Sequence, residues 1–450
     1  MHEDPREAER LAPAPPVGEP RRRRDLLRLA VVDLTPLRRH RDFRLLWVGQ
    51  GLSFFGSMVT YVAIPYQVYA LTGSSLMVGL ISAAELVPLL GAALYGGALA
   101  DWKDRRRMVQ LSELLLALCA GVLVVNALLP DPQVWVLFVV AMAMAGLDGI
   151  QRPSLDAMIP RLVDRDELTA ASALDSLRGN VGMIAGPALG GVLIAVFGLP
   201  LTYGFDMLTF GASLFALSRM RAVPPPADAE PPSLRRIAEG LRYARSRPEL
   251  VGTYGIDIVA MFFGMPQALF PAFANEFGGA SVLGLMYAAP SVGSLLATAT
   301  SGWTGRVHRH GLAVVVAATA WGAAVAGVGL APSLWLALAF LALAGAADMV
   351  SGIFRSTIWN QTIPDHLRGR LAGIEQVSYS TGPLLGNLES GVAASLFGVR
   401  AAIVSGGVLC VAGVAVAAAL LPAFVRYDAR SHELELTERL QPAQADPDEA

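Results

Sequence analysis

Long apolar stretches alternate with short polar connectors along almost the whole chain. Each stretch holds about the 20 apolar residues that a helix needs to cross a hydrocarbon core roughly 30 Å thick. The pattern predicts an all-α membrane protein. Its twelve transmembrane helices are expected over residues 43–71, 76–100, 107–129, 133–154, 169–198, 199–220, 249–275, 281–304, 311–331, 333–357, 369–397 and 400–425.

Basic residues gather in every second connector. The connectors after the odd-numbered spans hold one arginine, Arg400, whereas those after the even-numbered spans hold Lys103, Arg105, Arg161 and Arg306 among others. Short loops rich in lysine and arginine stay in the cytoplasm. We therefore expect a multi-pass protein of the cytoplasmic (inner) membrane, with the basic connectors and both chain ends in the cytoplasm.

One long connector divides the spans six and six. It begins with three prolines and continues as a basic amphipathic stretch, which suits a helix on the membrane surface. We expect a cytoplasmic tail over 1–42, a six-helix bundle over 43–220, a cytoplasmic linker over 221–248, a second six-helix bundle over 249–425 and a cytoplasmic tail over 426–450.

The two halves repeat one another. Segment 78–87 matches 283–292, Asp148 matches Asp348, and Gly186-Pro187 in the fifth span matches Gly382-Pro383 in the eleventh. Three matches in order indicate duplication. Two parallel halves related by an axis along the membrane normal are one of the main transporter architectures, so we expect two pseudo-symmetric six-helix bundles.

The composition and the absence of known motifs argue against several classes of function. Charged residues make up 16% of the chain, against about a quarter in a soluble domain. Its two cysteines, Cys119 and Cys410, lie in apolar runs. No metal-ligand spacing, phosphate-binding loop or set of nucleophile and base is present. We therefore expect no enzymatic activity, no cofactor, no metal and no nucleic-acid partner.

A compact motif lies between the second and third spans, in GALADWKDRRR. It resembles the loop motif of the major facilitator superfamily, although Trp102 replaces the usual basic residue and Asp104 the usual glycine. The resemblance implies a latch in which an aspartate faces the positive N-terminal end of another span. An ordinary basic loop is the alternative. The motif residues are Gly97, Asp101, Arg105 and Arg106.

The fifth span carries a glycine-rich motif, GMIAGPALGG. Its spacing resembles the antiporter motif of the same superfamily, which is associated with export families. The glycines form a flat face for close helix packing, and the proline bends the helix. A generic small-residue interface is the alternative. The motif residues are Gly182, Gly186, Pro187, Gly190 and Gly191.

From about Arg41 to Arg426 the chain resembles the branch of this superfamily that contains the bacterial enterobactin exporter. Segments HRDFRLLWVGQ, NALLPDPQVW and MIPRLVDRDEL carry the resemblance. It implies a monomer that exports a small amphipathic or aromatic molecule by alternating access, either a siderophore or a drug such as a macrolide. Aromatic residues such as Tyr61 are candidates for the substrate pocket, although packing explains most of them. An importer and a non-transporting receptor or scaffold are the rival interpretations.

Ionisable residues inside predicted spans are costly, so each is a functional hypothesis. The superfamily's central cavity is lined by spans 1, 4, 7 and 10, which places Asp148, Asp257 and Asp348 near it by resemblance. A carboxyl group in a low-dielectric cavity can bind and release protons near neutral pH, as proton-driven antiport requires. Structural ion pairs, such as Asp148 with Arg152 or Arg178, are the alternative. The candidates are Glu85, Asp148, Arg178, Asp257 and Asp348.

Other ionisable residues have simpler explanations. Glu113 lies near the inner end of its span, where its side chain is expected to reach water. Asp206 lies toward the outer end of its span, with the same expectation. Asp175 and Arg178 are spaced three residues apart, which favours an ion pair on one helix face.

Overall fold

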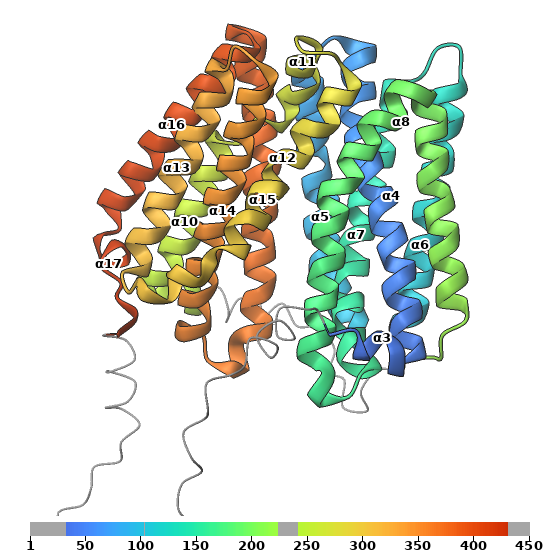
Figure 1. Cartoon of the computed structure of the whole chain (residues 1–450), viewed down its shortest axis with the longest axis horizontal. Helices are drawn as coiled ribbons and strands as arrows, with labels where there is room; N and C mark the ends of the chain where they lie inside the picture. Colours follow the sequence, from blue (N-terminus) through green and yellow to red (C-terminus); the bar gives the residue numbers. More distant parts are fainter. Residues whose placement is uncertain (1–32, 103, 224–241, 431–450) are drawn as a thin grey trace, which may run out of the picture.

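The computed structural model describes residues 33–102, 104–223 and 242–430, with the backbone alone at 93–102, 365–370, 372–374 and 376. These residues form helices and no strand (Figure 1). The helices are α3 (Thr35–Arg39), α4 (Arg41–Thr72), α5 (Ser75–Trp102), α6 (Arg105–Leu128), α7 (Val134–Leu162), η2 (Arg165–Glu167), α8 (Leu168–Ser218), α10 (Pro248–Phe263), η3 (Gln267–Leu269), α11 (Phe270–Asn275), α12 (Ala280–Ala299), η4 (Ser301–Arg306), α13 (His310–Leu330), α14 (Leu334–Thr362), α15 (Asp365–Phe397), α16 (Val399–Leu420) and α17 (Pro422–Val425).

The described helices account for every predicted span. Ten segments are long and apolar enough to cross a membrane, and one of them, Arg165–Ser218, contains both the fifth and the sixth predicted spans. Helix α15 corresponds to the eleventh predicted span. The chain is therefore a multi-pass, all-α membrane protein. The surface stretch predicted within the 221–248 linker falls largely on residues 224–241, outside the described residues.

Two glycines end spans in the same way in the two halves. Gly198 has φ 75° and ψ 172° between the fifth and sixth spans, and Gly398 has φ 85° and ψ 161° between the eleventh and twelfth. Residues with a Cβ rarely adopt this backbone conformation, so glycine allows the chain to turn back without a longer loop. The two positions lie 200 residues apart, in line with the predicted repeat.

The seventh predicted span, 249–275, is not one continuous helix. Helix α10 ends at Phe263, and the chain continues through η3 into the short α11. Gly264 caps α10 and packs against Trp321, and Pro266 follows two residues later without a backbone N–H to continue the helix. The prediction of a single helix was wrong because the apolar pattern runs through this break.

The helices form two groups, which we call the N-terminal bundle (α4–α8) and the C-terminal bundle (α10–α17). In the first, α4 packs on α8 and α5 on α7, and in the second α13 packs on α14 and α16. Two pairs join the bundles: α5 packs on α15 and α8 on α12. The bundles approach each other at the top of Figure 1, and the basic connectors lie at the bottom.

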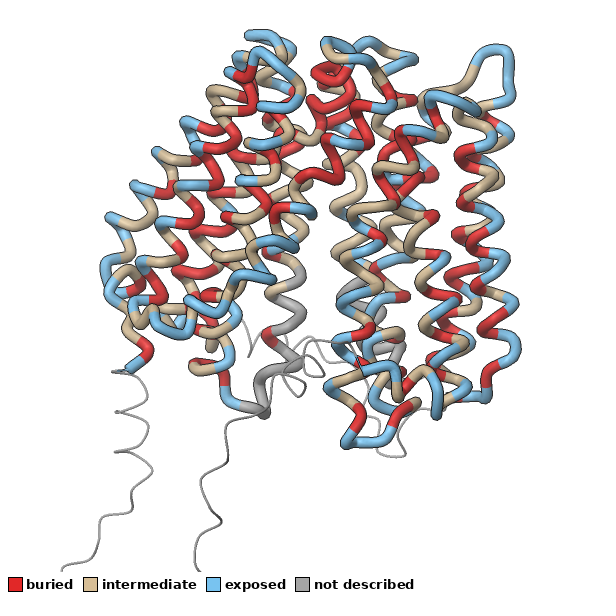
Figure 2. The backbone as a smooth tube through the Cα atoms, viewed as in Figure 1, coloured by how far each residue is buried: buried red, intermediate tan, exposed pale blue. Residues whose placement is uncertain are grey.

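Large apolar side chains stay exposed on the outside of both bundles. Leu208, Trp335 and Leu420 are each more than 70% exposed. Figure 2 shows exposed positions along the outer faces and buried ones where helices meet. In a membrane protein this outer surface contacts lipid, so its exposure carries no penalty.

Candidate functional site

The first crossing between the bundles is a close contact of two glycines. A Cβ atom added to Gly191 of α8 would lie 2.9 Å from the Cα of Gly284 of α12. In the reverse direction, a Cβ on Gly284 would lie 3.0 Å from the Cα of Gly191. Small residues allow helix backbones to approach this closely in membranes. The last glycine of the glycine-rich motif is therefore part of the inter-bundle contact.

The second crossing occupies the equivalent positions of the repeat. Gly79 of α5 packs on the backbone of Asn387 and Leu388 of α15. Asn387 donates a hydrogen bond of 3.4 Å to Ser82 of α5, and its Oδ1 accepts one of 3.0 Å from the Ala268 amide. A Gly–Gly contact in one crossing therefore corresponds to a polar Gly–Asn contact in the other.

A third contact lies between the two crossings. The Tyr61 hydroxyl of α4 donates a hydrogen bond of 2.6 Å to Oε1 of Gln267 in η3. Its ring meets that of Tyr287 of α12 edge to face, with centroids 5.3 Å apart. Glu85 of α5 lies within electrostatic range of both tyrosines. These residues join α4 and α5 of the N-terminal bundle to η3 and α12 of the C-terminal bundle.

A charged cluster crosses the C-terminal bundle. Arg355 of α14 forms an ion pair with Asp257 of α10 and lies 3.5 Å from Asp348 of its own helix. The Arg355 guanidinium also lies 5.1 Å from the centre of the Tyr379 ring of α15. Asp257 and Arg355 are buried, whereas the Asp348 side chain is 39% exposed. The cluster thus extends from the helix interior to an accessible carboxylate.

The Asp257–Arg355 pair is incompletely satisfied. Oδ2 of Asp257 and Nε of Arg355 are buried without a hydrogen-bond partner among the described residues. Buried polar atoms in proteins nearly always have partners, and exceptions often mark functional positions. A purely structural ion pair would be expected to use both atoms. The arrangement leaves a donor and an acceptor available for a substrate, a water molecule or a proton.

Arg355 was not among the residues predicted from the sequence. It lies seven residues after Asp348, two helical turns along the same face of α14. This spacing was the available signal, but Arg355 lies close to the end of the predicted span, where a basic residue is ordinary. Only the packing of α10 against α14 and α15 reveals that it joins two of the predicted carboxylates.

The N-terminal bundle places Asp148 and Arg178 in different surroundings. Asp148 is exposed on α7, within electrostatic range of Arg152 one turn away. Arg178 forms an ion pair of 2.6 Å with Asp175, which confirms the predicted i, i+3 pair. Among the described residues Arg178 has no ion pair with Asp148. The five candidates therefore do not form one cluster.

The loop motif is only partly described. Gly97 and Asp101 are described by their backbone alone, so the predicted latch stays a prediction. Arg105 is buried and donates a hydrogen bond of 3.3 Å to the Ala157 carbonyl of α7. Arg106 donates one of 3.3 Å to the Ser218 carbonyl, at the negative C-terminal end of α8. The two arginines connect three helices of the same bundle.

The other glycines of the glycine-rich motif face α4. Added Cβ atoms at Gly182 and Gly186 would collide with Phe54 and Met58, and one at Gly190 would lie 3.2 Å from the Cα of Val59. The motif therefore has two faces, one toward its own bundle and one, through Gly191, toward α12. Close packing explains the spacing of the glycines, and a role in export stays a prediction.

The expectations for Glu113 and Asp206 were wrong. Both side chains are buried at 0% exposure. Glu113 of α6 is surrounded by polar side chains of α4, α7 and α8, and Asp206 of α8 accepts a hydrogen bond of 2.5 Å from Thr60 of α4. Polar partners on other helices, which a single apolar stretch does not reveal, take the place of water.

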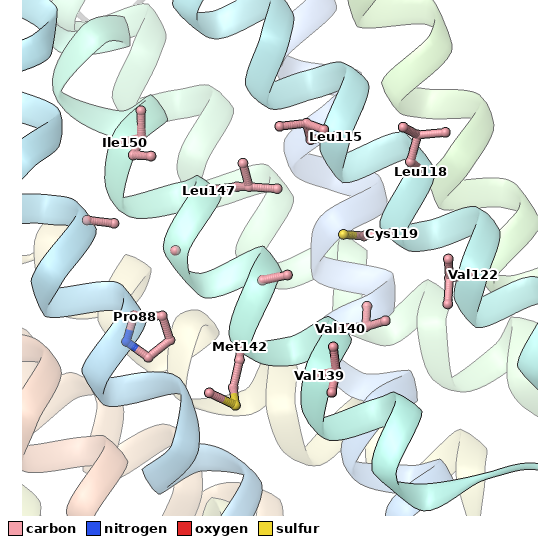
Figure 3. A pocket seen from close by; sticks show the side chains of 13 residues that line it. Pro88, Leu115, Leu118, Cys119, Val122, Val139, Val140, Met142, Leu147 and Ile150 are labelled. Carbon is pink, nitrogen blue, oxygen red and sulfur yellow. The ribbon is translucent and has the colours of Figure 1, made fainter.

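A cavity of about 660 Å³ opens on the N-terminal bundle between α5, α6 and α7 (Figure 3). Apolar side chains line it, among them Pro88, Leu115 and Leu147, together with the Cys119 thiol. No charged side chain is among its lining residues. The cavity is separate from the ionisable residues described above, and its apolar lining fits contact with lipid.

Comparison with known proteins gives close sequence relatives. Residues 31–445 match the family described as transmembrane secretion effector. The chain is 30% identical over 393 residues to an enterobactin exporter of Citrobacter koseri, covering 85% of this chain and 92% of that protein. It is 29% identical over 394 residues to an enterobactin exporter of Shigella boydii serotype 18, covering 85% and 93%.

Solved structures agree on the architecture. A bacterial homologue of the human lysosomal transporter Spinster, in an inward-facing and unoccupied conformation, has a TM-score of 0.66 at 16% identity, covering 89% of this chain and 98% of that chain. A bacterial homologue of the iron transporter ferroportin in the inward-facing state has a TM-score of 0.63 at 15% identity, covering 86% and 98%. At these identities the likeness shows the fold, which is that of the major facilitator superfamily.

Proposed function

The chain belongs to the transmembrane secretion effector family, and we propose that it exports a catecholate siderophore of the enterobactin type by proton-coupled alternating access. Its relatives and structural neighbours are transporters, so the chain is an efflux transporter rather than an enzyme. The siderophore follows from the names of the relatives, which share about 30% identity over 85% of this chain.

The observation that carries the mechanism is the one-sided contact between the bundles. The two crossings and the Tyr61–Gln267 hydrogen bond all lie toward one end of the helices. Alternating access requires two bundles that rock about a central site, closing one end while the other opens. In our proposal, this structure represents the state closed opposite the basic connectors.

The direction of opening follows from the distribution of basic residues. If the connectors rich in arginine lie in the cytoplasm, as the positive-inside rule predicts, the closed end faces outward. The proposed state is then inward-facing, in the cytoplasmic membrane, with both chain termini in the cytoplasm. Two of the matched solved structures are described as inward-facing, which supports this assignment.

We assign proton coupling to the Asp257–Arg355–Asp348 cluster. Arg355 serves two carboxylates, so protonation of either one leaves the cation with the other. Asp348 is the accessible member and exchanges protons with the cytoplasm, whereas the buried Asp257 holds Arg355 in place. Breaking a buried ion pair is strongly unfavourable, so a change in protonation is able to bias the packing of α10 against α14.

The substrate would bind between the bundles, beneath the closed end. Tyr61 offers an exposed aromatic ring there, which packs on the buried Tyr287, and Glu85 offers a hydrogen-bond acceptor close to both. Catechol rings stack on aromatic side chains and donate hydrogen bonds through their hydroxyl groups. An amphipathic drug such as a macrolide would use the same apolar and polar groups, and it is the second candidate substrate. One chain supplies both bundles, so the proposed working unit is a monomer in the lipid bilayer.

Inside-out membrane vesicles test this proposal, because their outer surface is the cytoplasmic face. With an acidic lumen, the vesicles should accumulate enterobactin more than vesicles without the protein, and a protonophore should abolish the difference. Accumulation of a macrolide but not of enterobactin would favour the second substrate. Enterobactin accumulation that ignores the protonophore would contradict proton coupling while leaving export in place.

A further inference from the structure

Glu113 lies at the centre of a buried polar cluster in the N-terminal bundle. Its Oε1 accepts hydrogen bonds from Gln50 of α4 at 2.9 Å and from Gln151 of α7 at 2.7 Å. The Ser53 hydroxyl of α4 lies 3.0 Å from Oε1 and 3.1 Å from Oε2. Gln50 also donates a hydrogen bond of 3.0 Å to Ser213 of α8. Four helices thus meet at one carboxyl group.

No cation neutralises this carboxyl group among the described residues. Its hydrogen-bond partners are two side-chain amides and hydroxyl groups, none of which carries a charge. Arg105 and Arg106 begin the same helix roughly 10–12 Å away along its axis. Asp206 of α8 lies within electrostatic range, and the Asp175–Arg178 pair lies beyond Gln50. An ionised carboxylate without a cation is costly in such an interior.

The hydrogen bonds suit a carboxyl group in either protonation state. Oε1 takes both amide donors, as the carbonyl oxygen of a neutral acid can. Oε2 lies 3.1 Å from the Ser53 hydroxyl, and the Ser213 hydroxyl of α8 is a further hydrogen-bond partner of the carboxyl group. A hydroxyl group is able either to donate to a carboxylate or to accept from a carboxylic acid. Rotation of these hydroxyl groups therefore allows the carboxyl group to keep hydrogen-bond partners when a proton binds or leaves.

A small cavity connects the cluster to accessible groups. The cavity is about 20 Å³, enough for a single water molecule. Its lining residues include Gln50, Asp156, Asp175 and Arg178. The Asp175 and Arg178 side chains are 33% and 18% exposed, so the cavity lies next to the surface of the bundle. Gln50, which lines the cavity, is also a hydrogen-bond donor to Glu113.

We propose that Glu113 is a proton-binding site inside the N-terminal bundle, distinct from the charged cluster of the C-terminal bundle, and that its proton passes through the cavity beside Gln50. A proton on Glu113 converts a charged hub of four helices into a neutral one. Because Gly182, Gly186 and Gly190 of α8 also pack closely against α4, the proton would change how firmly the bundle is held together. This inference does not depend on the exported molecule.

Infrared spectroscopy of the purified full-length protein in lipid nanodiscs tests the site directly. In the wild type, the carbonyl stretch of a neutral carboxylic acid should weaken as the pH is raised. Glu113→Gln should lack this titrating band. Asp206→Asn is the matched control, because it removes another fully buried carboxyl group of this bundle and should leave the Glu113 band in place. An identical pH titration in wild type and Glu113→Gln would overturn the proposal.

Two further variants keep the test decisive. If Glu113→Gln fails to fold, Glu113→Asp should retain a titrating band at a shifted frequency, and its absence would count against the site. For the route, Gln50→Leu should slow the exchange of the Glu113 proton for deuterium, whereas an exchange rate equal to that of wild type would overturn the passage beside Gln50. Size-exclusion chromatography and circular dichroism confirm that each variant is folded.

Discussion

Gly191 and Gly284 lie backbone to backbone across the two bundles, with room for no side chain between them. The equivalent crossing replaces one glycine by Asn387, whose amide connects α5 to α15 and to the interrupted seventh span. The closed end therefore combines a tight apolar contact with a polar one. Two contacts of this kind are able to separate as a unit, because neither contains an ion pair that must first be broken.

Gly191→Val should weaken closure of this end. The added side chain collides with Gly284, so the bundles should separate there and export should fall. Spin labels on the connectors at Gly73 and Gly278 should report longer distances than in wild type. Gly211→Val on the same helix is the matched control, because an added Cβ there meets nothing within 4 Å. Unchanged distances in Gly191→Val would contradict the role of the glycine contact.

Labelling from the two sides of the membrane should establish the topology. With Cys119 and Cys410 replaced by serine, a cysteine at Gly73 should react with an impermeant reagent from outside the cell. A cysteine at Gly305, beside the basic connector, should react only in inside-out vesicles. The opposite pattern at either position would reverse the orientation, and with it the assignment of an inward-facing state.

Arg355→Gln should destabilise the protein strongly. It leaves the buried Asp257 without its cation, a change that typically costs about 3–5 kcal/mol. Arg400→Gln is the matched control, because Arg400 and Glu276 form an ion pair whose side chains are both 40% exposed, worth about 0–1 kcal/mol. Thermal unfolding in detergent should separate the two variants clearly. Equal melting temperatures would argue that Arg355 and Asp257 are not paired in the membrane.

The double variant Arg355→Gln with Asp257→Asn separates stability from transport. Removing the uncompensated carboxylate should restore part of the lost stability, since two neutral side chains replace a buried charge. Proton-driven export should nevertheless stay absent, because no cation remains to alternate between Asp257 and Asp348. Recovery of export together with stability would show that the cluster has only a structural role.

The membrane-spanning helices were predictable because each needs a long apolar stretch, and that requirement is visible in sequence. The break after Gly264 was not, because the apolar residues continue through it. Glu113 was misjudged for a related reason. Its distance from the end of the apolar stretch suggested access to water, whereas its actual partners, Gln50 and Gln151, belong to two other helices. Contacts between helices distant in sequence leave no mark in the pattern of a single span.

Coupling should depend on the exposed carboxylates, and Asp348 and Asp148 are the first to test. They occupy equivalent positions of the repeat, yet Asp348 lies 3.5 Å from Arg355, whereas Asp148 is exposed beside Arg152. Asparagine keeps the size and part of the hydrogen bonding of each side chain and removes its proton site. Because Asp348 lies beside the buried Asp257–Arg355 ion pair, we expect Asp348→Asn to have the larger effect.

In inside-out vesicles, Asp348→Asn should bind enterobactin like wild type but lose the acceleration of uptake by an acidic lumen. Asp148→Asn should lose part of it, and the double variant should resemble Asp348→Asn. Binding to the purified variants, measured alongside, separates coupling from recognition of the substrate. If all three variants respond fully to the pH gradient, the proton site lies elsewhere, and Glu85 and Asp257 are the next residues to replace. A lasting response in those variants as well would make Glu113 the next residue to test, because its hydrogen-bond partners among the described residues are neutral and it is buried.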